Sequence, residues 1–218
     1  MLPVCVVVGA GPGIGQATAR KFLDRGFHVA LVARNLDKLE ALAEALGHEN
    51  VSTWTADVSD AEQLQAALSG VADGHGHPEV VIYNAFSLTP GRGSLLKKEN
   101  LELSFRVNVS SAMAFAQLVL PEMKKNSKGT LLFTGGGYAL CPEAKLTALS
   151  IGKAGLRTLA YCLYDELRPL GIHAGTVTVC GIVKQGTAFD PEKIACAFLE
   201  LHDQPKESFT AEVMFDGK

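Results

Sequence analysis

A cluster of glycines near the N-terminus has the spacing of a phosphate-binding turn. The stretch reads Val8-Gly9-Ala10-Gly11-Pro12-Gly13-Ile14-Gly15 and joins an apolar run, 4–8, to a segment of helical spacing, 16–25. Glycines let backbone N–H groups approach a diphosphate closely, and the N-terminus of the helix adds partial positive charge. The register is G-x-x-x-G-x-G, through Gly9, Gly13 and Gly15, because Ile14 stands where G-x-G-x-x-G needs its third glycine. The pattern favours a dinucleotide site over a merely tight turn.

The end of the next apolar run, 29–32, discriminates between dinucleotides. NAD sites place a carboxylate about 20 residues beyond the glycines, where it hydrogen-bonds the ribose 2′-hydroxyl. Here the candidate positions hold Ala33 and Arg34. No carboxylate repels a 2′-phosphate, and the planar, permanently charged guanidinium of Arg34 suits one. We therefore expect NADP(H) in preference to NAD(H), with a solvated arginine at a strand end as the alternative.

Short apolar runs alternate with longer segments of helical spacing along the whole chain. We expect strands at 4–8, 29–32, 51–55, 80–83, 131–133, 176–179 and 213–215, and helices at 16–25, 36–46, 61–71, 99–125, 146–170 and 194–201. Pro121 should bend or end the fourth of these helices. The alternation predicts an α/β, Rossmann-like, doubly wound fold with a parallel sheet of about seven strands and helices on both faces. No linker or repeat interrupts the series, so one domain, 1–218, is expected.

Composition excludes several classes of protein. The chain has 20 Lys+Arg and 23 Asp+Glu, a net charge of −3, so no basic surface for nucleic acid or an anionic membrane is expected. The apolar run 1–10 is too short to span a bilayer and has no basic leader. The five cysteines are odd in number and widely spaced: Cys5, Cys141, Cys162, Cys180 and Cys196. We therefore expect them to be reduced thiols that pack as small apolar residues in a cytoplasmic protein. His75 and His77 have no further ligand at motif spacing, so we expect no metal site.

The chain resembles the short-chain dehydrogenase/reductase family over essentially its whole length. Its glycine turn is similar to that family's T-G-x-x-x-G-I-G, with Val8 in place of the threonine and Ile14 retained. Asp57-Val58 resembles the acidic-hydrophobic pair after the third strand, in which the carboxylate contacts the adenine amino group. The resemblance implies an oxidoreductase that moves hydride between a nicotinamide and a carbonyl, alcohol or imine.

Further matches follow in the family's order. Tyr83-Asn84-Ala85-Phe86 resembles N-N-A-G, with the central Asn84 and Ala85 retained. Asn108 matches the helix asparagine of the family's proton relay. Gly181 falls where the family has its glycine beside the nicotinamide, and Val183 falls near the carboxamide.

The sequence departs from the family at the groups that move the proton. The family uses Y-x-x-x-K, in which the lysine and the ribose lower the pKa of the phenol, together with a serine after the fifth strand. Here the corresponding segment is Leu149-Ser150-Ile151-Gly152-Lys153, and the serine position falls at Gly136. The sequence therefore predicts an atypical member in which Asn108 and Lys153 remain and both hydroxyl groups are missing.

Tyr138 lies two residues after the vacant serine position and is a candidate for the missing acid; an aromatic lid is the alternative. Lys153 is expected to bind the cofactor ribose, unless it is a lysine that extends from an amphipathic helix to solvent. Two hypotheses follow: an NADP(H)-dependent oxidoreductase with an atypical or impaired relay, or an NADP(H)-binding sensor or interaction protein without turnover.

Neither the substrate nor the direction of hydride transfer can be read from the sequence. Only about ten residues separate Gly181 from the helix near Pro191, a short covering segment that implies an open or small site. The two long helices carry apolar stripes that, by resemblance, pair between subunits of a dimer or tetramer; burial against the sheet is the alternative.

Overall fold

The computed structural model describes residues 1–47 and 49–218 and contains one seven-stranded parallel sheet. The strands are β1 (Val4–Val8), β2 (His28–Ala33), β3 (Val51–Thr55), β4 (Pro78–Tyr83), β5 (Gly129–Gly136), β6 (Ile172–Val179) and β7 (Glu212–Phe215). The α-helices are α1 (Ile14–Asp24), α2 (Leu36–Leu46), α3 (Ala61–His75), α4 (Lys98–Phe105), α5 (Ser111–Asn126), α6 (Thr147–Leu167) and α7 (Pro191–His202). The predicted α/β, doubly wound fold is confirmed.

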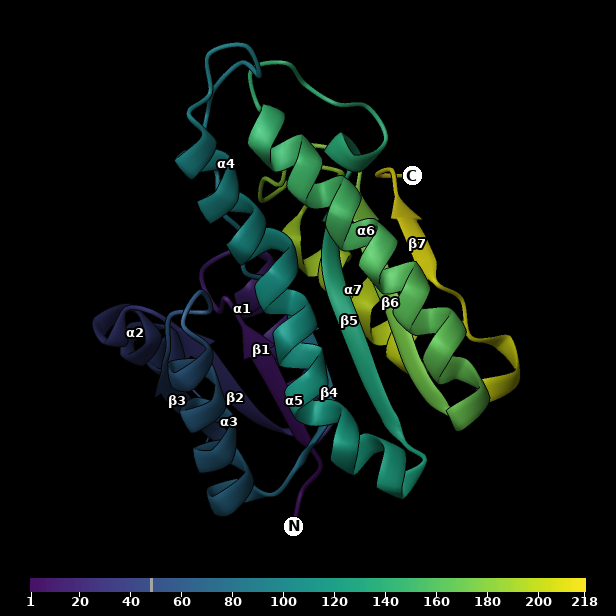
Figure 1. Cartoon of the computed structure of the whole chain (residues 1–218). Coiled ribbons are helices and arrows are strands. Elements are labelled where there is room, and N and C mark those ends of the chain that lie inside the picture. The colour runs from purple at the N-terminus through teal and green to yellow at the C-terminus, as the bar shows by residue number, and fades with distance from the viewer. Residues whose placement is uncertain (48) are drawn as a thin grey trace.

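The sheet order is β3-β2-β1-β4-β5-β6-β7, so the chain reverses its direction of growth between β1 and β4. Figure 1 shows α3, α5 and α6 over one face of the sheet and α1, α2 and α7 behind it. Strand β1 runs through the centre, and all five of its residues are buried, because helices cover it on both sides. In open sheets of this kind, ligands bind beyond the carboxyl ends of the strands at the point of reversal. That point lies between β1 and β4.

The predicted single helix over 99–125 is wrong in one respect. The structure divides it into α4, a π-helical turn at Arg106–Ser110, and α5. Helix α5 then continues through Pro121 to Asn126, so the proline does not end it. π-helical turns are rare and are frequently found at functional sites. Here the turn carries Asn108, whose side chain is buried.

Strand β5 is longer than its apolar run indicated. It extends to Gly136, so two of the three glycines expected after the strand belong to it, and Gly137 begins a short 3₁₀ turn at Gly137–Ala139. The backbone hydrogen bonds to β6 that hold this extension run through Gly135 and Gly136. The strand therefore ends directly beside the candidate site.

Candidate active site

The glycine turn after β1 has backbone angles and contacts that only glycine satisfies. Gly9 has φ of 75° and Gly13 has φ of 94°, both in the left-handed region. A Cβ on Gly9 would lie 2.4 Å from the Cα of Ala85, so the end of β4 and the turn touch through backbone. Ala85 thus lies against the turn.

Helix α1 presents an uncapped N-terminus to this turn. Its N-cap is Gly13, no side chain caps it, and its first turn carries no acidic residue. A Cβ on Gly13 would meet nothing within 4 Å, so the space in front of the helix is open. Backbone N–H groups at a helix N-terminus attract an anion, and the turn through Ile14 and Gly15 fits a diphosphate.

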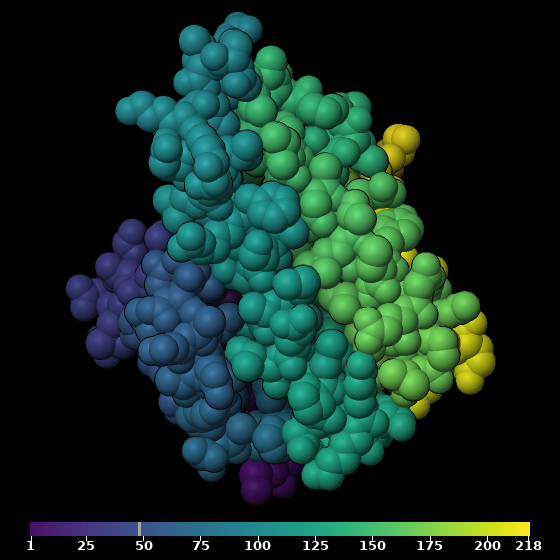
Figure 2. Space-filling view, viewed as in Figure 1, coloured from purple at the N-terminus to yellow at the C-terminus, as the bar shows by residue number. Residues whose placement is uncertain are grey.

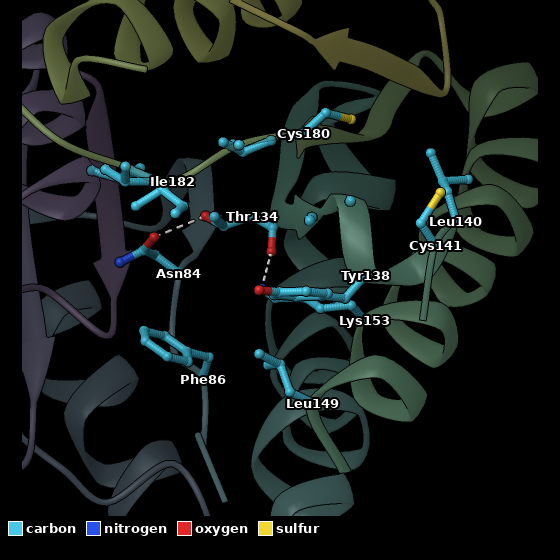
Figure 3. A pocket seen from close by; sticks show the side chains of 17 residues that line it. Asn84, Phe86, Thr134, Tyr138, Leu140, Cys141, Leu149, Lys153, Cys180 and Ile182 are labelled. Carbon is cyan, nitrogen blue, oxygen red and sulfur yellow. Dashed lines mark hydrogen bonds between the residues drawn. The ribbon is translucent and has the colours of Figure 1, made fainter. Parts of the chain in front are cut away.

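Asn84 ties the glycine turn to β5. Its Nδ2 donates to the carbonyl oxygen of Gly9 at 2.9 Å, and its Oδ1 accepts from the hydroxyl of Thr134 at 2.9 Å. Figure 3 shows this second bond at the inner end of the cavity. Asn84 therefore fixes the relative positions of three strand ends. No pattern in the sequence pointed to its partner Thr134.

The groups expected around the adenosine lie at the ends of β2 and β3. The Arg34 side chain is 73% exposed, and its Nη1 lies 3.9 Å from Oδ2 of Asp57. Asp57 accepts hydrogen bonds from the backbone N–H and hydroxyl of Ser59. Burial alone would raise the pKa of Asp57, but these bonds and the Arg34 cation hold it below its ordinary value. The side chain of Val58 is buried in the core.

A cavity of about 440 Å³ begins at α1 and extends along the ends of β4, β5 and β6. Seventeen residues line it: Ile14, Asn84, Phe86, Thr134, Gly135, Gly136, Gly137, Tyr138, Leu140, Cys141, Leu149, Lys153, Val179, Cys180, Gly181, Ile182 and Val183. Phe86, Leu140, Cys141 and Ile182 were missed by sequence reasoning. Only their position in the sequence could have identified these four residues, because each follows the carboxyl end of a strand, at the edge of the sheet where the glycine turn lies.

Lys153 is the one charged residue among those that line the cavity. Its Nζ donates to the carbonyl oxygen of Thr134 at 2.6 Å and lies 5.8 Å from the centre of the Phe86 ring. Burial lowers the pKa of Lys153 from 10.5 to about 8, because no neighbouring carboxylate offsets the loss of hydration. Lys153 therefore does not extend to solvent.

Leu149 and Gly136, where the resemblance implies hydroxyl side chains, both border Lys153. Leu149 lies one helical turn before it on α6, is 6% exposed and contributes to the cavity wall. A Cβ on Gly136 would lie 3.5 Å from Cε of Lys153, an ordinary contact, so a small side chain fits there. Tyr138 also lines the cavity and is 37% exposed. Figure 3 shows Phe86, Leu149 and Lys153 around the same opening.

Asn108 is not among the residues that line the cavity. Its side chain accepts from the backbone N–H of Ser87 at 2.8 Å and donates to the Ser87 carbonyl oxygen at 3.2 Å and to Ser104 Oγ at 3.1 Å. These bonds fasten the loop that follows β4 to the π-turn. In this arrangement Asn108 positions the Phe86 segment of the cavity wall.

Residues 1–47 and 49–218 contain no group of three or more His, Cys, Asp or Glu side chains placed to hold a metal ion, and their five cysteines are free thiols. One continuous helical stretch, Lys98–Asn126, is long and apolar enough to cross a bilayer, but 44% of its most apolar window is buried within the protein. A buried core helix meets the same criteria.

Comparison with known proteins agrees with this geometry. An uncharacterized oxidoreductase of Staphylococcus aureus (strain N315) is 27% identical over 212 residues, which span 93% of this chain and 92% of that protein. A 2,3-dihydro-2,3-dihydroxybenzoate dehydrogenase of Bacillus subtilis (strain 168) is 27% identical over 186 residues, 84% of this chain and 69% of that protein.

Solved structures are also similar. A metagenomic short-chain oxidoreductase in complex with NADP superposes with a TM-score of 0.88 at 27% identity, over 97% of this chain and 96% of that one. An alcohol dehydrogenase from the archaeon Thermococcus sibiricus, complexed with 5-hydroxy-NADP, gives 0.87 at 25% identity over 98% and 96%. The family model described as short chain dehydrogenase matches residues 3–193. The chain belongs to the short chain dehydrogenase family of oxidoreductases, whose fold binds a nicotinamide cofactor.

Proposed function

We propose that the protein is an NADP(H)-dependent oxidoreductase that interconverts a neutral, apolar carbonyl compound and its alcohol, with a weakened proton relay. The observation that carries this proposal is the continuity of the cavity. It begins at Ile14 in the glycine turn and reaches Lys153 on α6. A dinucleotide bound at the turn would thus extend its reactive end into a water-poor cleft.

The residues present fit that cofactor. The backbone N–H groups at Gly13, Ile14 and Gly15 would hold the diphosphate, and Asp57 is placed for the adenine. Lys153 would donate to the nicotinamide ribose, while Gly181 and Val183 would border the nicotinamide. When bound, the nicotinamide supplies or accepts the hydride.

Arg34 supports NADP(H) over NAD(H). Its guanidinium is free to turn toward a 2′-phosphate, because its only ion pair among the described residues is the long contact with Asp57. The NADP and 5-hydroxy-NADP in the two similar structures support the same choice.

The cavity wall limits the substrate. Apolar side chains from five segments surround it, and the described lining contains no Asp, Glu, Arg or His side chain. A cationic substrate would lose its hydration without gaining a carboxylate partner, at a cost of several kcal/mol. An anionic substrate would have to compete with the cofactor ribose for Lys153, the one cation of the lining. We therefore place neutral carbonyl compounds with hydrocarbon substituents in this site.

Proton transfer is the weak step. Leu149 carries no proton, and Gly136 offers no hydroxyl to the substrate oxygen. We propose Tyr138 as the replacement acid, since it is the phenol on the cavity wall. Loss of a positioned general acid costs about 10²–10⁴-fold in rate, so slow turnover is expected.

The test measures oxidation of NADPH by a panel of carbonyl compounds, followed through nicotinamide absorbance. Neutral aldehydes and ketones should react above the background given by Lys153→Ala, and keto acids should not. The Tyr138→Phe variant should lower kcat for these compounds, because it removes the phenol hydroxyl that we propose as the acid. Tight NADPH binding with no oxidation by any compound would contradict the proposal.

A second copy of the chain is proposed to cover the outer faces of α5 and α6. Figure 2 shows these helices on one face of the molecule, and Met113, Leu118 and Tyr161 are exposed there. Met113→Lys should shift the mass in solution toward the monomer, as measured by light scattering. We place this assembly in the cytoplasm, where five free thiols persist.

A further inference from the structure

We propose that Lys153 is also a covalent site for small neutral aldehydes, which its amine captures reversibly as an imine without any nicotinamide cofactor. Three observations converge on it: the cavity, the absence of a carboxylate from its described lining, and the backbone hydrogen bond that holds the amine.

The cavity brings an apolar carbonyl compound to the amine. Lys153 borders a space of about 440 Å³, and Phe86 and Leu149 border the same space. The stem of Lys153 passes Gly136, where a Cβ would lie 3.5 Å from its Cε. Leu149, one turn before Lys153 on α6, carries no hydroxyl, and Tyr138 is the phenol that lines the same cavity.

The hydrogen bonding of Lys153 Nζ leaves the lone pair of the neutral amine available for reaction. One N–H donates to the Thr134 carbonyl oxygen, and no salt bridge to Lys153 occurs among the described residues. A neutral amine has a lone pair that points away from the hydrogen it donates, so that bond orients the nucleophile. The described residues that line the cavity carry no carboxylate that would keep the amine protonated.

Burial also provides the neutral form near physiological pH. With its pKa lowered to about 8, about a tenth of the Lys153 amines are neutral at pH 7, against about one in three thousand for an ordinary lysine. Lysines desolvated in apolar pockets are activated as nucleophiles in this way.

The step balances without an oxidant or reductant. The Nζ lone pair forms a bond to the carbonyl carbon, and two amine protons leave with the carbonyl oxygen as water, which yields a C=N bond. If the imine then takes up a proton, its single N–H replaces the amine N–H as donor to Thr134. The product keeps the hydrogen bond that the free lysine makes.

The experiment uses the purified full-length chain, free of nicotinamide cofactor, with benzaldehyde and sodium cyanoborohydride, which fixes an imine as a stable amine. Peptide mass spectrometry should find benzyl groups on Lys153 at least about tenfold faster than on the exposed Lys98 at pH 7. The rate should rise as the pH approaches 8 and level off above it.

Two controls keep the result decisive. Lys153→Arg should remove the fast labelling, and the pH dependence of the unaltered chain tests the proposal even if that variant fails to fold. Labelling confined to exposed lysines, or a Lys153 rate that still rises steeply above pH 9, would overturn it. Added NADPH should protect Lys153. Fast labelling without such protection would uphold this site and contradict the ribose contact in the proposed function.

Discussion

Lys153 is buried, which is rare for a charged side chain, and its neighbours Leu149 and Gly136 carry no hydroxyl group. Its stem packs on Gly136, its head binds Thr134, and Leu149 lies one turn away on the same helix. The lysine is therefore held by packing and one backbone carbonyl. This arrangement leaves space in which the missing hydroxyl groups can be restored.

Restoring both hydroxyl groups should accelerate turnover. In the double variant Gly136→Ser and Leu149→Tyr, the new phenol lies one turn before Lys153, and the serine Cβ makes an ordinary contact with Cε. We expect kcat for a neutral aldehyde to rise by about 10²-fold or more, because a positioned general acid is regained. Steady-state kinetics with NADPH measures the change.

The matched control for this restoration is Gly136→Ser with Leu149→Phe, which supplies the same ring without its hydroxyl. This control should leave kcat near its original value. Equal rates for the two double variants, at equal NADPH affinity, would show that the vacant positions do not limit turnover.

Cofactor choice is also a residue-scale property. Arg34→Ala should weaken NADPH binding about tenfold or more, since a charge-assisted hydrogen bond contributes about 1.5–3 kcal/mol. NADH binding should hardly change, because NADH has no 2′-phosphate for the guanidinium to contact. Fluorescence titration with each cofactor measures both. Equal losses of affinity for NADPH and NADH would show that Arg34 has a structural role only.

At the scale of elements, α6 approaches the π-turn because α6 has glycine at the contact. A Cβ on Gly152 would lie 2.7 Å from Nδ2 and 2.8 Å from Cβ of Asn108. The Asn108 side chain in turn holds Ser87. The close approach of these two elements thereby sets the loop that carries Phe86 into the cavity.

Gly152→Ala should lower the free energy of unfolding by about 1–3 kcal/mol, because the added methyl group overpacks against Asn108. The matched control is Gly74→Ala on α3, where a Cβ would meet nothing within 4 Å. There alanine should stabilise the helix by up to about 1 kcal/mol. Urea unfolding of both variants gives the comparison. Similar effects of the same sign would contradict this packing.

The elements were largely predictable, and the reason is periodicity. Buried strands such as β1 are continuous apolar runs, and the helices keep a spacing near 3.6, so the order of elements and the sheet follow. The π-turn at Asn108 was not predictable, because a single extra residue per turn hardly changes the apolar spacing. The extension of β5 was also missed, since Gly135 and Gly136 carry no strand signal and are paired through the backbone of β6.

The same contrast holds for the site. Sequence analysis identified Gly9, Gly13 and Lys153. The backbone conformation of the turn requires glycine, and a charged residue at motif spacing can be recognised in the sequence. The part of the cavity wall made by Phe86, Leu140 and Ile182 was not found, because these are ordinary apolar residues that reach the site only where distant strand ends meet.

For the molecule as a whole, two buried histidines, His28 and His173, and the partly buried His202 should make stability depend on pH. Burial lowers the pKa of His28, His173 and His202 below the ordinary value of 6.5. The unfolded chain therefore binds more protons than the folded one just below pH 6.5, and stability is lost as the pH falls through that range.

The urea concentration at the midpoint of unfolding should therefore decrease when the pH is lowered from 7.5 to 5.5. His28 stacks on His75 at 3.6 Å, so His28→Asn should reduce the fall by removing one of the three groups and its repulsion with that neighbour. The exposed His77→Gln should leave the pH dependence unchanged. A midpoint that is flat over this range would refute the assignment of neutral, buried imidazoles.

The most direct measurement of the proposed activity follows an isotope. The protein is incubated with NADPH deuterated at C4 of the nicotinamide and with a neutral apolar aldehyde, and the alcohol formed is analysed by mass spectrometry. We expect deuterium on the former carbonyl carbon, well above the amount formed with Lys153→Ala. Bound NADPH together with an alcohol that carries no deuterium above that background would contradict the assignment of this protein as a reductase.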